Sequence, residues 1–147
     1  MTEYNNTCLG CSLANEQLPV YTVYETELVT CILDHDPFQE GHVLILPKVH
    51  VKEAVHLELT TATAIMETAV LLSKAINNTF KPDGITICQN GGTFNELDHV
   101  HVHVVPRYQH QSFADFYSDA PSDNEHLKKK LAETHVILQN AIREVLR

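Results

Sequence analysis

The stretch HVHVHVV, at residues 99–105, places three histidines at every second position, with valines between and after them. Successive side chains of a β-strand point to opposite faces of the sheet, so this alternation predicts a strand with a histidine face and a valine face. We expect the valine face to pack on the core, against a long helix, and the histidine face to be open to a ligand or a metal. Pro106 follows and ends the predicted strand.

Imidazole side chains offer two kinds of chemistry on such a face. They act as nucleophile, acid or base near neutral pH, and they are also common metal ligands. A plain solvent-exposed face is the remaining alternative, but such faces more often carry threonine, lysine, glutamate or arginine. The pattern therefore indicates a functional site, and leaves open whether it is catalytic or holds a metal.

Length and charge restrict the class of protein. The chain has 147 residues and is 44% hydrophobic, which predicts a single domain with a sizeable core. Its net charge of −9 argues against binding to nucleic acid polymers, although a small phosphate ligand needs only a local site. Neither a membrane-spanning apolar run nor a signal peptide pattern is evident, so we expect a cytoplasmic protein with no membrane partner.

Four further segments predict strands, because they are rich in β-branched and apolar residues and are bounded by turn signals. They are Val20–Glu25, Leu28–Asp34, His42–Leu46 and Ile85–Gln89.

Two helices complete the predicted fold. Apolar residues spaced by three or four predict a long helix that begins after an N-cap at Thr60 and runs to about Phe80. A second helix is expected over Asp123–Leu146, with Ser122 and Glu125 at capping-box spacing. The order of elements predicts an α+β fold with a mainly antiparallel five-stranded sheet, a long helix and a C-terminal helix.

The histidine stretch resembles the H-φ-H-φ-H-φ-φ signature (φ apolar) of the histidine triad (HIT) family of nucleotide hydrolases and transferases. The likeness extends to the VPR that follows, to LDHDPFQEGHVLILPKVH upstream and to the N-terminal CLGC. The resemblance implies a single HIT domain over residues 1–147, with a core at about 8–107 and a C-terminal extension whose helix spans about 123–146. It also implies a homodimer.

This resemblance implies a catalytic role for three histidines. His101 would attack the α-phosphate of a nucleotide and form a covalent nucleotidyl-histidine, which water then cleaves. His103 and His42 would orient the imidazole and donate hydrogen bonds to the phosphate or its neighbours. The implied substrate is a purine nucleotide or a nucleotide conjugate, such as a phosphoramidate or a dinucleoside polyphosphate.

Other polar residues are candidates for contacts with the nucleotide. Asp34 would accept hydrogen bonds from the ribose hydroxyls, although an aspartate before Asp36-Pro37 is alone better explained as a turn-initiating residue. Gln89 and Asn90 are candidates for contacts with the phosphate or the leaving group. Arg107 would either reach a distal phosphate or form a surface salt bridge.

One segment departs from the family pattern. Many HIT enzymes carry Gly-Gln-Ser or Gly-Gln-Thr just upstream of the signature, where this chain has Phe94-Asn95-Glu96. Asn95 can replace the glutamine amide, but Glu96 cannot donate a hydrogen bond and would repel a phosphate that it faced. This departure favours an alternative function, that of a nucleotide-binding sensor or adaptor with little turnover.

The pair Cys8 and Cys11 has the spacing of half a zinc site. Several HIT proteins hold zinc with such a pair and two histidines, which map here to His50 and His99. The resemblance thus implies a closed, structural zinc site; the alternative is two reduced cysteines and an unliganded His50. A catalytic metal held jointly by all three signature histidines is a third reading of the stretch.

The segment Tyr108–Asp119 (YQHQSFADFYSD) is aromatic and polar without a clear period. It either covers the site and selects the leaving group, or simply connects the histidine strand to the final helix.

Overall fold

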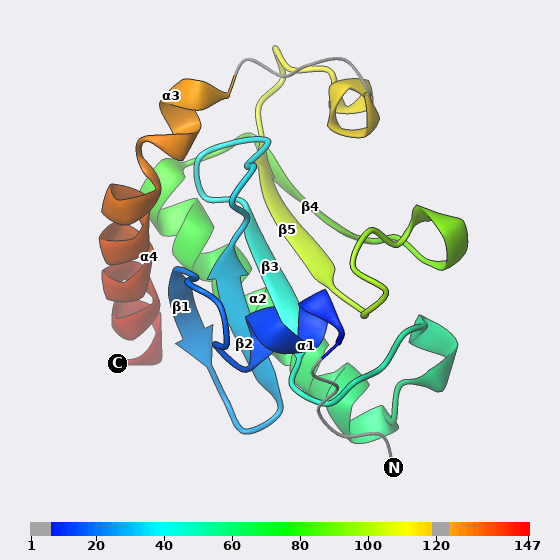
Figure 1. Cartoon of the computed structure of the whole chain (residues 1–147). Helices are drawn as coiled ribbons and strands as arrows, with labels where there is room; N and C mark the ends of the chain where they lie inside the picture. Colours follow the sequence, from blue (N-terminus) through cyan, green and yellow to red (C-terminus); the bar gives the residue numbers. More distant parts are fainter. Residues whose placement is uncertain (1–6, 119–123) are drawn as a thin grey trace.

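A computed structural model of the chain describes residues 7–118 and 124–147. Its centre is an antiparallel five-stranded sheet in the order β1-β2-β3-β5-β4, in agreement with the predicted fold class (Figure 1). The strands are β1 (Thr22–Glu25), β2 (Val29–Leu33), β3 (Val43–Pro47), β4 (Gly84–Gln89) and β5 (Val102–Arg107). The α-helices are α1 (Leu9–Ala14), α2 (Leu59–Phe80), α3 (Glu125–Lys128) and α4 (Leu131–Leu146), and the 3-10 helices are η1 (Ala54–His56), η2 (Gly92–Phe94) and η3 (Phe113–Tyr117).

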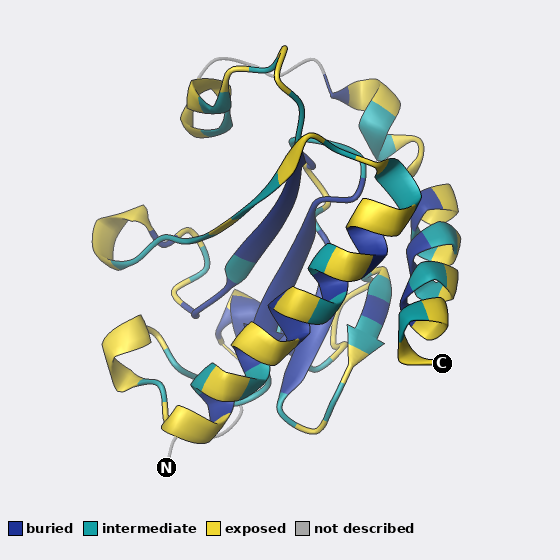
Figure 2. Ribbon diagram, turned by 180° about the vertical axis from the view of Figure 1, so that it is seen from behind, coloured by how far each residue is buried: buried dark blue, intermediate teal, exposed yellow. Residues whose placement is uncertain are grey.

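The helices cover the two faces of the sheet unequally. Helix α2 crosses one face and α4 lies against α2 and β1, whereas the short α1 lies on the opposite face (Figures 1 and 2). The buried stripe of α2 includes Ile65, Ala69, Leu72 and Ile76, as its helical spacing predicts, and packs on the inner side of β2 and β3. By length and composition α2 is also the one described helix that is apolar enough to span a membrane, but here its apolar stripe belongs to the core.

The histidine strand begins later than predicted. Strand β5 starts at Val102, so His99 and His101 precede it and only His103 lies within it. Strand β3 pairs with β5 only from Val102 to Val104. Before that point the chain turns away from β3, and the Val100 backbone N–H donates to the Val51 carbonyl oxygen instead. The same short pairing explains why β5 continues through Pro106. Strand β3 begins at Val43, opposite Val104, and does not reach Pro106, so the missing proline N–H costs no ladder hydrogen bond to β3.

The expectation of an open histidine face is wrong. The side chains of His99, His101 and His103 are 0%, 4% and 8% exposed. They are covered because α1 packs over His99, and the η3 turn packs beside His103. On the other face Val104 is buried in the core and packs with residues of α2, as predicted.

Two helix boundaries also differ from the prediction. Helix α2 begins at Leu59 after Glu58, so Thr60 lies inside the first turn and is not its N-cap. The C-terminal helix is divided into α3 and α4. At its start the Asn124 amide donates to the Pro37 carbonyl, which draws α3 towards the loop after β2. The predicted cap Ser122 lies outside the described residues.

Candidate functional site

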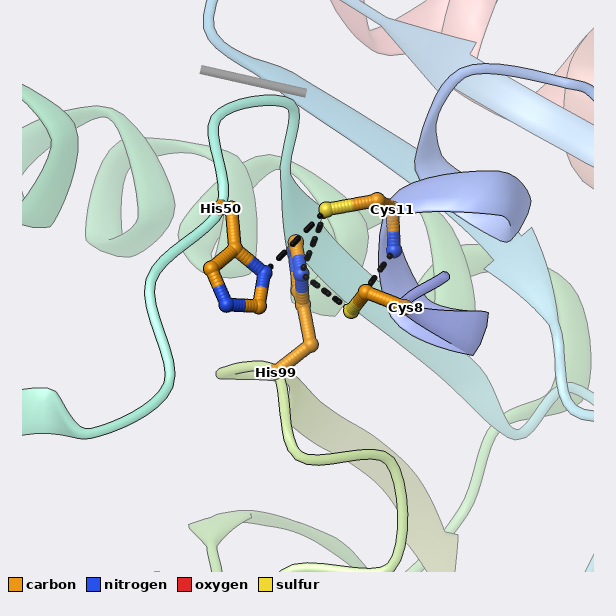
Figure 3. A group of neighbouring side chains, drawn as sticks. All are labelled: Cys8, Cys11, His50 and His99. Atoms are coloured by element: carbon orange, nitrogen blue, oxygen red, sulfur yellow. Dashed lines mark hydrogen bonds between the residues drawn. The ribbon is translucent and has the colours of Figure 1, made fainter. Parts of the chain in front are cut away.

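Four sulfur- and nitrogen-bearing side chains meet where α1 lies on the sheet (Figure 3). Cys8 is the N-cap of α1, and its Sγ accepts a hydrogen bond from the Cys11 backbone N–H at 3.3 Å. His50 follows β3, and His99 precedes β5. The structure therefore brings together all four of the predicted metal ligands, from three separate parts of the chain.

The spacing of these donor atoms fits a tetrahedral zinc ion. His99 Nδ1 lies 3.5 Å from both Cys8 Sγ and Cys11 Sγ, and His50 Nδ1 lies 3.3 Å from Cys11 Sγ. Zinc bonds of about 2.3 Å to sulfur and about 2.0 Å to nitrogen, at a tetrahedral angle, put such donors about 3.5 Å apart. Two thiols and two imidazoles are also a donor set that zinc prefers in closed structural sites.

The His99 ring is held in the form that a metal needs. Its Nε2 lies 2.8 Å from the Pro47 carbonyl oxygen, which can only accept, so Nε2 carries the proton and the Nδ1 lone pair faces the thiols. Burial, with smaller effects from His50 and His101, lowers the pKa of His99 to about 4, so the ring is neutral at neutral pH. Gly10 makes the close approach possible, because a Cβ there would overlap the His99 Cβ.

A second group forms on the same face of the sheet. His42, just before β3, lies beside His103 in β5: its Nε2 is 2.9 Å from His103 Nδ1 and 3.5 Å from the Asp34 carboxylate. The Phe38 backbone N–H donates to His42 Nδ1 at 3.1 Å, so neutral His42 carries its proton on Nε2. His42 therefore donates to His103 Nδ1, which leaves the remaining proton of His103 on Nε2.

His101 lies next to this pair, with its ring centroid 5.1 Å from that of His103. Its Nδ1 is 2.9 Å from the His99 carbonyl oxygen, so Nδ1 donates and the Nε2 lone pair is free to attack an electrophile. His99 thus has two roles, because its ring belongs to the four-residue donor group and its carbonyl sets the tautomer of His101.

Burial keeps the pair His42 and His103 neutral. It lowers the pKa of His42 to about 3, with smaller effects from the charges of His103 and His101. It lowers the pKa of His103 to about 4, again with a smaller effect from His101. Burial also raises the pKa of Asp34 to about 6, and the charge of Glu96 adds to that rise.

Comparison with known proteins identifies the family. The HIT domain family matches residues 15–110. This chain is a member of the HIT domain family.

Curated HIT relatives include two named enzymes. The adenosine 5′-monophosphoramidase HNT1 of Saccharomyces cerevisiae is 33% identical over 107 residues, which cover 71% of this chain and 65% of that protein. The adenylylsulfatase HINT3 of Arabidopsis thaliana is 30% identical over 104 residues, which cover 69% of this chain and 53% of that protein. The chain thus spans about half the length of the second relative.

A solved HIT structure agrees over nearly the whole chain. The crystal structure of a Zn-bound histidine triad family protein from Mycobacterium smegmatis aligns with a TM-score of 0.77 and 25% identity. The alignment covers 95% of both chains, so the likeness of fold extends beyond the matched domain into the C-terminal helices.

The three signature histidines of this HIT chain do not converge on one point. His99 faces the cysteines, whereas His103 faces His42 and Asp34, and the two donor groups among the described residues keep them apart. The group of Asp34, His42 and His103 is itself compact enough for a metal. However, the Phe38 N–H keeps the proton of His42 on Nε2, the nitrogen that would have to coordinate the metal. The group therefore fits a hydrogen bond from His42 to His103 better than a metal site.

Four predicted contact residues lie farther along β4 and β5 or in the loop between them. Asn95 is buried and both ends of its amide bind backbone, at Lys52 and Leu97. The remaining contacts are Gln89 Nε2 to the Asn90 carbonyl oxygen at 3.0 Å, Tyr117 hydroxyl to Asn90 Oδ1 at 3.4 Å, and Arg107 Nη1 to Thr86 Oγ1 at 2.8 Å. None of these contacts involves His42, His101 or His103.

Sequence reasoning did not single out two contributors to the site. Phe38 supplies the N–H that fixes His42. Phe116 packs its ring 5.2 Å from His103 and 5.7 Å from His42, and it belongs to the segment Tyr108–Asp119 that was considered as a cover for the site without any residue being named. A backbone donor leaves no signal in residue type. The aromatic run from Phe113 to Tyr117 was visible in the sequence, but its contact with the histidines depends on the tertiary fold.

Proposed function

We propose that this HIT protein is a nucleotide hydrolase or nucleotidyl transferase that uses His101 as its nucleophile. The observation that carries the proposal is the hydrogen bond from His101 Nδ1 to the His99 carbonyl, which leaves Nε2 as the nitrogen with the free lone pair in the neutral ring. The names of the relatives, a monophosphoramidase and an adenylylsulfatase, support an adenylyl group joined to a leaving group as the substrate class.

The proposed reaction has two steps. His101 Nε2 forms a bond to the α-phosphorus, and the leaving group departs with the electrons of its own bond to phosphorus and takes a proton from solvent. His103 Nε2–H donates a hydrogen bond to the phosphate or the departing atom, and His42 holds His103 in that tautomer. Water then attacks the phosphorus and loses a proton to solvent, while the bond between phosphorus and His101 Nε2 breaks and returns its electron pair to that nitrogen.

Asp34 is proposed to bind the ribose hydroxyls. Its carboxylate lies 3.5 Å from His42 Nε2 at the end of β2, so a ribose held there would place the nucleotide beside the histidines. Gln89, Asn90, Asn95 and Arg107 remain proposed contacts for the phosphate or the leaving group.

Cys8, Cys11, His50 and His99 are proposed to hold one structural zinc ion. The ion would cross-link α1 to the segment before β5, and so fix the His99 carbonyl that orients His101. All four ligands come from the protein, so no open position is left for catalysis.

A homodimer of one-domain subunits in the cytoplasm is the proposed working form, without nucleic acid or membrane partners. Strand β4 lies at the edge of the sheet, and the adjacent face of α2 exposes Met66 and Val70, at 56% and 47%. Ile87 of β4 adds to this apolar surface. A second copy placed there would cover both the edge and the patch.

AMP release tests the proposed function. The wild type is expected to release AMP from adenosine 5′-phosphoramidate or diadenosine tetraphosphate, and His101→Asn is expected to lose this activity by about a thousandfold or more. His126→Asn, on the exposed side of α3, is the matched control and should keep full activity. Equal activity in His101→Asn and the wild type would refute the proposed nucleophile.

A nucleotide sensor is the second candidate, and Glu96 favours it. The charge of Glu96 adds a small rise to the pKa of Asp34, the proposed ribose contact, so an acidic group acts on that carboxyl where many family members have a hydroxyl. Tight AMP binding by a folded wild type, with no release from either substrate, would support the sensor over the enzyme.

A further inference from the structure

The turn η3 lies outside the residues that the HIT family matches, but it contacts the centre of the site. The match ends at residue 110, and η3 spans Phe113–Tyr117, the short golden helix at the upper right of Figure 1. Phe116 packs against both His103 and His42, and meets the His103 ring at 89°. The turn is therefore part of the surroundings of the histidine that faces the leaving group in the proposed reaction.

Contacts on two sides hold this turn in place. On the sheet side, the Arg107 guanidinium lies 4.1 Å from the centroid of Phe113 and donates to Thr86 of β4. On the loop side, Phe38 meets Phe113 and Phe116 edge to face, at 5.8 and 5.6 Å between centroids. Phe113 and Phe116 themselves stack 4.9 Å apart at 12°. The aromatic turn is a packed element of the structure, which gives its exposed ring a defined position.

That exposed ring is Tyr117, whose side chain is 57% exposed. Its hydroxyl lies 3.4 Å from Asn90 Oδ1 and also interacts with the thiol of Cys88. Cys88 is the β4 partner of His103, so both side chains lie on the same face of the sheet. The Tyr117 ring contacts Phe113 and Phe116 and remains open to solvent, and Phe116 in turn packs on His103.

The leaving group of the proposed reaction departs next to His103. We propose that the turn Phe113–Tyr117 is the leaving-group subsite, with Tyr117 as a specificity-determining residue that stacks on planar, aromatic leaving groups. The rings that form this subsite offer apolar faces, and Arg107 stacks on Phe113 and so supports the position of these rings. The subsite therefore favours an aromatic amine or nucleoside over a small amine. This inference rests on the proposed function.

Two phosphoramidates of AMP with different amines test it. One carries 2-phenylethylamine and the other ethylamine, so that only the phenyl ring distinguishes the leaving groups. We expect the wild type to favour the aromatic substrate in kcat/KM, and Tyr117→Ala to reduce that preference by about tenfold. Tyr117→Phe, which keeps the ring and loses only the hydroxyl, should retain the preference.

The outcomes separate this inference from the proposed function. An aromatic preference that is unchanged in Tyr117→Ala, in an enzyme that releases AMP from both substrates, would overturn the subsite and leave the hydrolase intact. Release of AMP from neither substrate by the wild type would overturn both. Phe116→Leu provides a second variant: a loss of preference there together with Tyr117→Ala supports the subsite, and retention in both contradicts it.

Discussion

Backbone groups select the proton positions of His42, His99 and His101. The Phe38 N–H, the Pro47 carbonyl and the His99 carbonyl each bind one ring nitrogen, and each contact fixes which nitrogen of that ring carries the proton. Because a backbone N–H only donates and a carbonyl only accepts, these tautomers follow from the fold itself. The tautomer of His101, on which its proposed role depends, is therefore set by the path of the chain as much as by the signature residues.

Removing the His42 side chain is expected to lower kcat/KM by about 10- to 100-fold, because His103 would lose the donor that fixes its tautomer. His42→Gln is the matched variant to His42→Ala, since the glutamine amide can still present an N–H to His103. Steady-state kinetics with adenosine 5′-phosphoramidate should rank wild type, Gln and Ala in that order. An Ala variant as active as the wild type would show that His42 has no positioning role.

Acidification is expected to destabilise the protein through the same pair. The folded pKa values of about 3 for His42 and about 4 for His103 lie below the unfolded value of about 6.5. Their contribution to stability is therefore complete above about pH 6.5 and is lost as the pH falls towards about 4. Asp34 opposes this trend, because its raised pKa of about 6 gives a contribution that grows as the pH falls.

Urea unfolding of the wild type and of His42→Gln, at several pH values between about 7.5 and about 5, measures the effect. When the pH is lowered over this range, the free energy of unfolding should fall more in the wild type than in His42→Gln. Zinc release affects both proteins alike and cancels in the difference. An identical pH dependence in the two proteins would contradict the lowered pKa of His42.

At the scale of elements, the short helix α1 joins the proposed zinc ligands to the segment before β5. It supplies both cysteines, and Gly10 between them packs directly on His99. The position of α1 is therefore linked to the proposed nucleophile, since the His99 carbonyl binds His101.

Gly10→Ala is expected to destabilise the protein by about 1–3 kcal/mol, because the added methyl group would overlap His99 and force α1 away from it. Bound zinc per chain should fall at the same time. Gly84→Ala is the matched control, since a Cβ at that position meets nothing within 4 Å. Thermal unfolding and elemental analysis give the two readouts, and full zinc content with unchanged stability in Gly10→Ala would refute the close packing.

Element periodicity was readable from the sequence, and tertiary pairing was not. The stripe of α2 and the alternation around His103 come from local spacing, so both were predicted correctly. The late start of β5 follows from the turn of the chain before Val102, where the Val100 N–H donates to the Val51 carbonyl, and α3 begins after Asn124, which binds the distant Pro37. Neither partner is recognisable from the local sequence.

The four-residue donor group was predicted in full because its residue types matched a family pattern. The aromatic contact of Phe116 with the histidines had no such pattern, because it joins residues that are more than ten positions apart along the chain. Burial of the histidine face followed from the same packing, and alternation alone does not report it.

For the whole molecule, the sheet edge and α2 form a candidate surface for a second copy. Light scattering is expected to give a mass of two 16.6 kDa chains. Val70→Glu should weaken the dimer by about tenfold or more, because it places a charge in the apolar patch of α2. Val136→Glu on α4 is the control, since that valine is 54% exposed, slightly more than Val70, and lies on another helix. A wild type with the mass of one chain would refute the dimer.

The central claim is a covalent nucleotidyl group on His101, and its direct detection is the decisive measurement. Wild-type protein is mixed with adenosine 5′-phosphoramidate, quenched within the first turnover and analysed by intact mass and peptide mapping. We predict one added adenylyl group, located on the peptide that contains His101 and absent from His101→Asn. Rapid AMP release without any adduct, or with an adduct on another residue, would contradict the proposed mechanism.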